Sequence, residues 1–290
     1  MHIKSHAGRL ALLAAALIWG SSFIIMKDAV SDVPVFLLLG IRFTIAAVLL
    51  AIVCFQRLRK ADRRVLLGGL LCGALLFGAY TTQTFGLIGS TPGKNAFLTA
   101  VYCVLVPFIT WAIFRVRPTR WNWIAAVMCI AGIGLVSLGD DLTITSGDYL
   151  TLIGGVFYAF HIIVLSHLTG RSDPIALTTI QFGTTAVLSW SLHLLTEQGA
   201  AFPAPAVWPQ LLYLAVFCTA ATLLLQSVGQ KLTPPSQSAI LLSLESVFGV
   251  LFSVIMGAED LTLALVCGFA LIFLSVIVSE TQLAFLRPRK

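Results

Sequence analysis

Charged side chains are scarce in this sequence of 290 residues. They make up 10% of it, whereas hydrophobic residues make up 58% and the mean hydropathy is +0.97. An ordinary soluble domain has roughly 25% charged residues, because polar side chains must cover its surface. The composition therefore excludes a soluble globule and predicts an integral membrane protein whose main solvent is lipid.

Motifs for metals and nucleotides are also missing from the sequence. All six cysteines fall inside apolar stretches, without a CxxC spacing and without a nearby cluster of His or acidic residues. Neither a disulfide framework nor a zinc site is therefore predicted. The sequence has no Walker A tract, which argues against direct use of ATP. We expect no cofactor and no metal.

The sequence has an excess of basic residues, with a net charge of +6 and a pI of about 9.2. Such an excess can indicate a nucleic-acid partner, but here the bases lie in short loops between apolar runs. We therefore expect a lipid bilayer, and no nucleic acid, as the partner. The stretch from Leu10 to Ile18 resembles a signal peptide, but no A-x-A site follows and the apolar run continues to Ile25. We interpret it as the first membrane span.

Apolar segments of membrane-spanning length follow one another along the whole chain. A bilayer core about 30 Å thick needs about 20 apolar residues in a helix. Breaks rich in charge, Pro or Gly leave ten such segments, at residues 9–29, 34–55, 65–88, 93–114, 121–139, 148–168, 174–196, 207–229, 235–257 and 261–283. Because the connections are short, neighbouring helices should be antiparallel. The predicted fold class is an all-α integral membrane protein with ten transmembrane helices.

Basic residues flank these spans unevenly. With the N-terminus inside, the inner loops and tails carry most of them; only Lys27 and Lys94 lie at the outer ends, and Arg42 lies within the second span. Acidic residues such as Asp148 and Glu197 collect on the outer side. The positive-inside rule therefore predicts a multi-pass protein of the inner, or cytoplasmic, membrane with both termini in the cytoplasm.

The second half of the sequence repeats the first. A shift of 143 residues superposes residue types that rarely coincide by chance in lipid, namely Gln83 on Gln226, Gly86 on Gly229 and Pro92 on Pro235. Earlier in the halves, a shift of 139 residues places Arg42 on Gln181. We divide the chain at residues 1–145 and 146–290 into two five-helix units. Because five is odd, the second unit should be inverted in the membrane, with a substrate site near the midplane between the halves.

Several short tracts, in their order, resemble those of the EamA-type transporters of the drug/metabolite transporter superfamily. They are Trp19-Gly20-Ser21-Ser22-Phe23, Arg42-Phe43, Gln83-x-x-Gly86 running into Thr91-Pro92, Pro107, and Leu244-Glu245-Ser246-Val247-Phe248 ahead of Gly257-Ala258-Glu259-Asp260-Leu261-Thr262. The resemblance covers the whole chain and implies a transporter rather than an enzyme. The sequence departs from the family where Ser246 stands at a position that is often Pro.

Polar groups at membrane depth are costly and need a partner or a water-filled cavity. Glu245 is the outstanding case, with Gln237 two turns earlier on the same helix face. It either faces the central cavity, where it binds a proton or a cationic group, or is a neutral or Arg42-paired acid that fixes helix packing. Arg42 keeps its charge, so it either clamps a substrate carboxylate or contacts Glu245, a helix end or backbone carbonyls.

The repeat also places polar groups on corresponding faces of the fourth and ninth spans. Lys94 falls on Gln237 and Tyr102 on Glu245, so these faces are expected to line the cavity, although Lys94 could instead reach the membrane interface. His161 is either a proton relay or a hydrogen-bonded core residue, of which the second is favoured.

Trp19 and Tyr80 complete the set of candidate residues, because their mid-span rings suit either a cavity wall or ordinary packing.

The leading interpretation is a secondary transporter that exports a small metabolite, amino acid or drug-like compound by alternating access. Proton coupling and facilitated transport both remain open, as do a monomer and a weak homodimer. An intramembrane enzyme is the alternative class, but the strings at residues 137–141 and 146–148 lie at the outer mouth and lack paired-aspartate spacing. A channel would need a ring of like groups along a pore, which a lone Glu245 does not supply.

Overall fold

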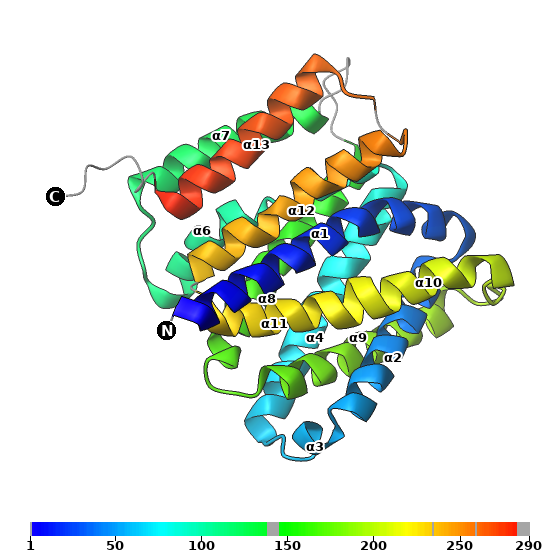
Figure 1. Ribbon diagram of the computed structural model, residues 1–290. Coiled ribbons are helices and arrows are strands. Elements are labelled where there is room, and N and C mark those ends of the chain that lie inside the picture. Colours follow the sequence, from blue (N-terminus) through cyan, green and yellow to red (C-terminus); the bar gives the residue numbers. More distant parts are fainter. Residues whose placement is uncertain (1, 138–144, 234, 259, 283–290) are drawn as a thin grey trace.

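The computed structural model describes residues 2–137, 145–233, 235–258 and 260–282, drawn as ribbons in Figure 1. The side chains of a few residues near helix ends, Gln237 among them, lie outside the description. Within these ranges every regular element is a helix, in agreement with the all-α prediction.

The helices follow the predicted order. The first half contains α1 (His2–Asp32), α2 (Val35–Val53), α3 (Phe55–Leu58), α4 (Arg63–Ile88), α5 (Pro92–Thr99), α6 (Tyr102–Phe114) and α7 (Arg120–Ser137). The second half contains α8 (Ser146–Thr169), α9 (Pro174–Thr196), the 3₁₀ turn η1 (Pro205–Val207), α10 (Trp208–Ala215), the π-helical segment η2 (Val216–Ala221), α11 (Thr222–Leu232), α12 (Pro235–Ile255) and α13 (Leu263–Thr281). The predicted fourth span is therefore interrupted between α5 and α6, and the eighth contains a π-helical segment.

Side chains in the loops determine where several helices begin. The Asp62 carboxylate accepts a hydrogen bond from the backbone N–H of Val65 at the start of α4. Thr145 and Asp148 form a reciprocal capping box at the start of α8, and Asp173 accepts two backbone N–H groups of α9. The first turn of a helix has no internal partner for these N–H groups, so the caps fix the helix boundaries.

Seven helical segments of the described chain are long and apolar enough to cross a membrane, and three further apolar helices are shorter. The seven are His6–Asp32, Val35–Val53, Arg63–Ile88, Pro92–Phe114, Ser146–Thr169, Pro174–Thr196 and Pro205–Leu232; the shorter ones are Arg120–Leu135, Leu241–Ile255 and Leu263–Val278. Each sequence-predicted span overlaps one of these segments. The chain is thus built as a multi-pass membrane protein, and the crossing of all ten helices stays a prediction.

The helices gather into two three-helix groups that interlock the halves of the chain. The first bundle consists of α4, the broken helix α5–α6 and α8; the second bundle consists of α1, α11 and α12. Each bundle therefore includes the first helix of the other half. The pair α2 and α9 packs along one flank and the pair α7 and α13 along the opposite flank (Figure 1).

Glycines allow close helix contacts within both bundles. In the first bundle, a Cβ on Gly86 of α4 would lie 2.7 Å from the carbonyl oxygen of Gly147 in α8. In the second bundle, a Cβ on Gly229 of α11 would lie 3.1 Å from the carbonyl oxygen of Gly8 in α1. Gly86 and Gly229 correspond in the 143-residue repeat, so equivalent positions make equivalent contacts in the two bundles.

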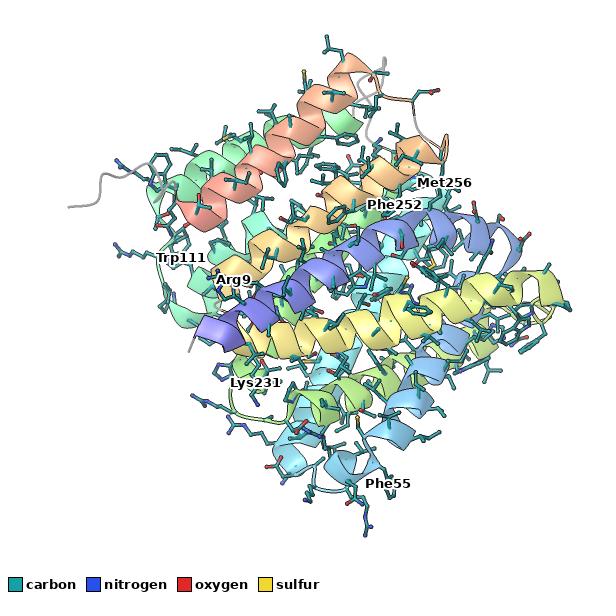
Figure 2. All side chains as sticks on the ribbon, viewed as in Figure 1. Arg9, Phe55, Trp111, Lys231, Phe252 and Met256 are labelled. Atoms are coloured by element: carbon teal, nitrogen blue, oxygen red, sulfur yellow. The ribbon has the colours of Figure 1, made fainter. Side chains whose placement is uncertain are left out.

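The end of the molecule at which α1 begins is called the N-side below, and the opposite end the far side. The end of α13 also lies on the N-side (Figure 1). Figure 2 places Arg9, Lys231 and Trp111 on the N-side and Met256 on the far side. Arg9 and Lys231 are among the residues that the positive-inside rule assigns to the cytoplasm.

Candidate functional site

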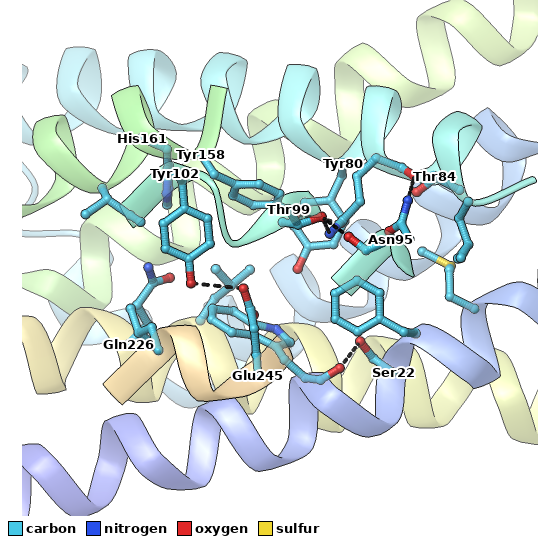
Figure 3. Close-up of a pocket in the computed structure, with 18 of the residues that line it drawn as sticks. Ser22, Tyr80, Thr84, Asn95, Thr99, Tyr102, Tyr158, His161, Gln226 and Glu245 are labelled. Carbon is cyan, nitrogen blue, oxygen red and sulfur yellow. Dashed lines mark hydrogen bonds between the residues drawn. The ribbon is translucent and has the colours of Figure 1, made fainter. Parts of the chain in front are cut away.

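A cavity lies between the two bundles, lined from both sides and by α2 (Figure 3). The first bundle contributes Tyr80, Gln83, Thr84, Leu87, Asn95, Thr99, Tyr102, Tyr158, His161 and Ile162; the second contributes Trp19, Ser22, Phe23, Met26, Leu223, Gln226, Leu242 and Glu245; and α2 contributes Arg42. The centre of a water molecule can occupy only about 40 Å³ of the space between these side chains. The cavity is therefore narrow in this conformation.

Glu245 lies in the wall of this cavity and is 6% exposed. The Tyr102 hydroxyl donates a hydrogen bond to Glu245 Oε1 over 2.9 Å, which Figure 3 shows as a dashed line between the bundles. These two residues occupy equivalent positions in the 143-residue repeat. The hydrogen bond therefore joins the two halves at equivalent points, and it meets part of the cost of placing a carboxyl group at membrane depth.

Arg42 is held by the π-helical segment η2 and has no carboxylate partner in the described chain. Its guanidinium donates from Nε to Thr219 Oγ1 and from Nη2 to the Cys218 carbonyl oxygen at 3.1 Å. The Tyr80 ring lies 4.7 Å from the guanidinium carbon, close enough for a cation–π interaction. The ion pairs among the described residues do not include Arg42 or Glu245. The proposed Arg42–Glu245 pair is thus absent from this conformation, and the alternative of backbone carbonyl contact is present.

The Cys218 carbonyl oxygen also explains the position of Trp19. It accepts hydrogen bonds from the Trp19 indole N–H at 3.0 Å and from the Thr222 hydroxyl at 2.7 Å, in addition to Arg42. A π-helical turn disturbs the regular i→i−4 pattern and is often found at functional sites. Here it presents one backbone oxygen to α1 and α2 together, which fixes two cavity-lining side chains.

Amide and hydroxyl groups of the first bundle form a hydrogen-bonded chain along the cavity. Gln83 donates to Thr99 Oγ1 at 3.0 Å and accepts from the Tyr158 hydroxyl at 2.9 Å. Asn95 donates to Gln83 O and to Thr151 Oγ1. These bonds connect α4, α5 and α8, so the first bundle presents an ordered polar surface to the cavity.

Four buried polar atoms of lining residues have no hydrogen-bond partner among the residues that the structure describes. They are Thr84 Oγ1, Asn95 Oδ1, His161 Nδ1 and Gln226 Oε1. Buried polar atoms are usually hydrogen-bonded, and exceptions often mark a position for water or a ligand. These atoms offer hydrogen-bonding positions to a polar molecule in the cavity.

His161 and Tyr80 line the cavity while also taking part in packing. His161 Nε2 lies 3.0 Å from Gln181 Oε1, which matches the hydrogen-bonded core histidine favoured from the sequence. The Tyr80 ring packs edge-to-face on Phe43 and on Tyr158. Lining and packing are therefore not alternatives for these residues.

Lys94 is a candidate that does not line this cavity. The Lys94 ammonium lies 2.9 Å from the buried Asp148 carboxylate at the far-side start of α8, so it is ion-paired rather than extended into the membrane interface. Asn95, Thr99 and Tyr102 form the lining face of α5 and α6, and Lys94 lies beside that face. The side chain of Gln237 lies outside the described residues, as do residues 138–144 with most of the acidic string at residues 137–141.

Sequence reasoning missed Asn95, Thr99 and Tyr158 as lining residues and assigned Gln83 and Gln226 no role in the cavity. The repeat of Gln83 and Gln226 was the available signal. The described residues also contain no group of three His, Cys, Asp or Glu side chains that could hold a metal ion.

Comparison with known proteins identifies the family. A profile of the EamA-like transporter family matches residues 6–138 and again residues 145–281. A transporter of Archaeoglobus fulgidus, described as uncharacterized, is 32% identical over 276 residues, which cover 95% of this chain and 86% of that protein.

More distant relatives carry similar descriptions. The uncharacterized transporter YetK of Bacillus subtilis is 26% identical over 98% of this chain and 91% of its own length. The uncharacterized inner membrane transporter YedA of Escherichia coli K12 is 27% identical over 71% of this chain and 69% of its own length.

A solved crystal structure shares the fold, with a TM-score of 0.74 and 19% identity over 97% of this chain and 98% of that one. The two family matches, the multi-pass helical architecture and the enclosed cavity agree with one another. This chain belongs to the EamA-like transporter family and is a membrane transporter.

Proposed function

We propose that the chain is a secondary transporter that carries a small organic solute out of the cell by alternating access, with the cavity between the bundles as its substrate site. The narrow cavity, lined by both bundles at once, is the observation that carries this proposal. A cavity so narrow has room for only a few water molecules. Binding and release of a solute therefore require the bundles to separate.

Hydrogen bonds between the bundles identify contacts that would change in this movement. Lys27 of α1 donates from Nζ to the carbonyl oxygens of Leu87, Ile88 and Ser90 at the far-side end of α4, at 2.8 to 2.9 Å. The Tyr102–Glu245 hydrogen bond lies deeper in the cavity. Opening toward the far side would break the Lys27 contacts, whereas opening toward the N-side could keep them.

The internal repeat supports two alternative openings. Equivalent glycines hold equivalent helices together in the two bundles, as expected if an inverted twofold relation exchanges an outward-open state for an inward-open one. With the N-side in the cytoplasm, both termini lie inside the cell. The division at residues 145 and 146 then separates the two inverted units.

The groups in the cavity favour an amphoteric solute with an apolar or aromatic body. Arg42 supplies a positive charge and the Glu245 carboxyl group can supply a negative one, while Trp19, Tyr80 and Tyr158 supply ring surfaces. An amino acid fits this chemistry, since its carboxylate suits Arg42 and its ammonium suits Glu245. Glu245 could alternatively bind a proton that drives transport.

The first prediction concerns Glu245→Gln in proteoliposomes loaded with radiolabelled amino acids. If Glu245 binds the coupling proton, the variant should lose flux driven by a pH gradient by about tenfold or more, equivalent to roughly 1.4 kcal/mol, yet keep solute exchange without a gradient. If Glu245 contacts the solute ammonium, both activities should fall. Tyr102→Phe serves as the matched control, because it removes the hydrogen bond to Glu245 and keeps the carboxyl group.

Wild-type flux with unchanged pH dependence in Glu245→Gln would contradict a role of this residue in transport. Solute flux through wild-type protein that rises linearly with concentration, without saturation, would contradict alternating access and favour a channel. Thermal unfolding of both variants checks that the fold survives, since the Gln substitution preserves the size of the side chain.

A further inference from the structure

A second hollow lies on the outer surface of the first bundle at the N-side, between α4, the last turn of α6 and α8. It is separate from the central cavity and shares no lining residue with it. Its volume is about 690 Å³ of space that the centre of a water molecule can occupy, within the range of about 300 to 1,000 Å³ that is common for ligand pockets. We call it the N-side groove.

The walls of the N-side groove are apolar along most of their length. Leu67 and Leu71 of α4 and Phe114 of α6 are each about half exposed, at 53%, 51% and 48%. These side chains lie on helices of membrane-spanning length. In a membrane their exposed faces contact acyl chains, so the groove has the surface that a lipid tail requires.

The mouth of the groove is basic. Arg63 and Arg64 lie in the first turn of α4, and His167 of α8 also lines the groove, with its ring stacked on Phe114 at a centroid distance of 6.0 Å. The ion pairs of the described chain do not include either arginine. The nearest acid in sequence, Asp62, caps the helix by accepting the Val65 N–H. The two arginines therefore outnumber the one adjacent carboxylate, and the groove mouth keeps a net positive charge.

The two arginines lie at a helix N-terminus, and this position indicates which kind of ligand the groove mouth favours. Basic side chains at a helix N-terminus are opposed by the helix dipole, which favours anions there. Two adjacent arginines in the first turn of the 26-residue helix α4 would therefore gain from an anion placed between them and the helix end. A phosphate group is a suitable anion, because it pairs with guanidinium groups and is attracted to helix N-termini.

We propose that the N-side groove is a binding site for one anionic phospholipid. Its phosphate lies at Arg63 and Arg64, and one acyl chain lies along Leu67, Leu71 and Phe114. Basic pockets between helices on the cytoplasmic side are a recognised form of anionic lipid site. The charge of the mouth and the apolar wall beneath it favour a lipid over a soluble phosphate compound, since one phospholipid molecule contacts both at once.

The test uses the full chain, purified in an uncharged detergent, and phosphatidylglycerol as the probe. Thermal unfolding and native mass spectrometry are measured with phosphatidylglycerol, with phosphatidylcholine and with inorganic phosphate. We expect phosphatidylglycerol to raise the unfolding temperature more than phosphatidylcholine does and to give a resolved one-lipid adduct. Inorganic phosphate should produce no comparable shift.

Matched variants separate the groove from general surface charge. In the double variant Arg63→Gln with Arg64→Gln, the difference in unfolding temperature between the two lipids should fall by more than half. The control Arg59→Gln with Lys60→Gln removes the same charge at the same end of the molecule and should keep that difference. Leu71→Trp narrows the groove without changing charge and should also lose the one-lipid adduct.

Three results would overturn the proposal. The first is an equal rise in unfolding temperature with the two lipids. The second is an equal loss of the lipid difference in the two double variants. The third is a rise in unfolding temperature of the same size with inorganic phosphate. If the arginine double variant fails to fold, Leu71→Trp and the adduct count decide the question.

Discussion

At the scale of single residues, Arg42 and Glu245, the two ionisable groups discussed for the cavity, are held by neutral partners. Arg42 donates to a threonine hydroxyl and a backbone carbonyl, and Glu245 accepts from a tyrosine hydroxyl. Neither group forms an ion pair among the described residues. Since an unpaired charge at membrane depth is costly, this arrangement leaves both groups able to gain from a ligand of opposite charge or, for Glu245, from a proton.

Asp173, in the loop before α9, carries a second prediction. Partial burial raises the pKa of Asp173, but hydrogen bonds from the N–H groups of Ala176 and Ile175 and from Arg57 outweigh this and hold the pKa below its usual value. The charged form is therefore favoured by folding, and its contribution to stability is fully present at neutral pH. It is lost as the pH falls below the ordinary aspartate range near 4.

Asp173→Ala removes both the cap and the ion pair with Arg57, and at neutral pH should cost about 1 kcal/mol of unfolding free energy. Asp173→Asn keeps an amide oxygen for the cap and should cost less. The difference between wild type and Asp173→Ala should shrink as the pH is lowered from 6 to 3, as measured by thermal unfolding in detergent. A difference that grows on acidification would contradict the direction of the pKa shift.

At the scale of elements, two departures from regular helix shape the cavity. The helix is interrupted between Thr99 at the end of α5 and Tyr102 at the start of α6, and both residues line the cavity, as does Asn95. The π-helical segment η2 presents the Cys218 carbonyl to Arg42 and Trp19. In lipid, irregular backbone is tolerated where it lines a cavity or is buried in protein, which is where both departures occur.

The contact between α4 and α8 leads to a third prediction. An alanine at Gly86 would place its Cβ 2.7 Å from the Gly147 carbonyl oxygen and 2.9 Å from the Thr151 N–H nitrogen, both backbone atoms. Because neither neighbour can move without shifting a helix, Gly86→Ala should destabilise the protein by about 1 to 3 kcal/mol. Thermal unfolding in detergent measures this loss.

Gly183 of α9 provides the control, since a Cβ there would meet no atom within 4 Å. Gly183→Ala should leave stability unchanged or raise it by up to about 1 kcal/mol, the difference in helix propensity. Similar effects of the two substitutions would show that close packing of α4 on α8 is not what Gly86 supplies.

At the scale of the whole molecule, the two halves of the duplicated chain are interlocked. Each bundle contains the first helix of the other half, so a relative movement of the bundles displaces helices of both repeats together. The flanking pairs α2 with α9 and α7 with α13 also join one helix from each half. In the proposed alternating-access movement, we expect these pairs to lie at the sides of the moving bundles.

A fourth prediction concerns the orientation of the chain in the membrane. In a variant with the native cysteines replaced, Lys231→Cys on the N-side and Met256→Cys on the far side serve as a matched pair, since both side chains are exposed. A membrane-impermeant maleimide added to intact spheroplasts should label Met256→Cys and leave Lys231→Cys unlabelled until the membrane is opened. The opposite pattern would place the termini outside the cell.

The sequence alone determined the class of fold and the approximate limits of the helices. Scarce charge and long apolar runs require lipid, and caps such as Asp62 and Asp173 mark helix starts locally. Glu245, Arg42, Tyr102, His161, Trp19 and Tyr80 could be named as candidates because polar or aromatic groups at membrane depth are costly or uncommon, and all of them line the cavity.

Only the tertiary structure decided which groups are partners. Glu245 meets Tyr102 rather than Arg42, Lys94 meets Asp148, and Arg42 meets a carbonyl that a π-helical turn exposes. These pairings depend on how helices distant in the sequence are placed side by side and on one local departure from the α-helix. The sequence periodicity of a transmembrane helix indicates neither the placement of its neighbours nor such a departure, because its lipid-facing and protein-facing sides are both apolar.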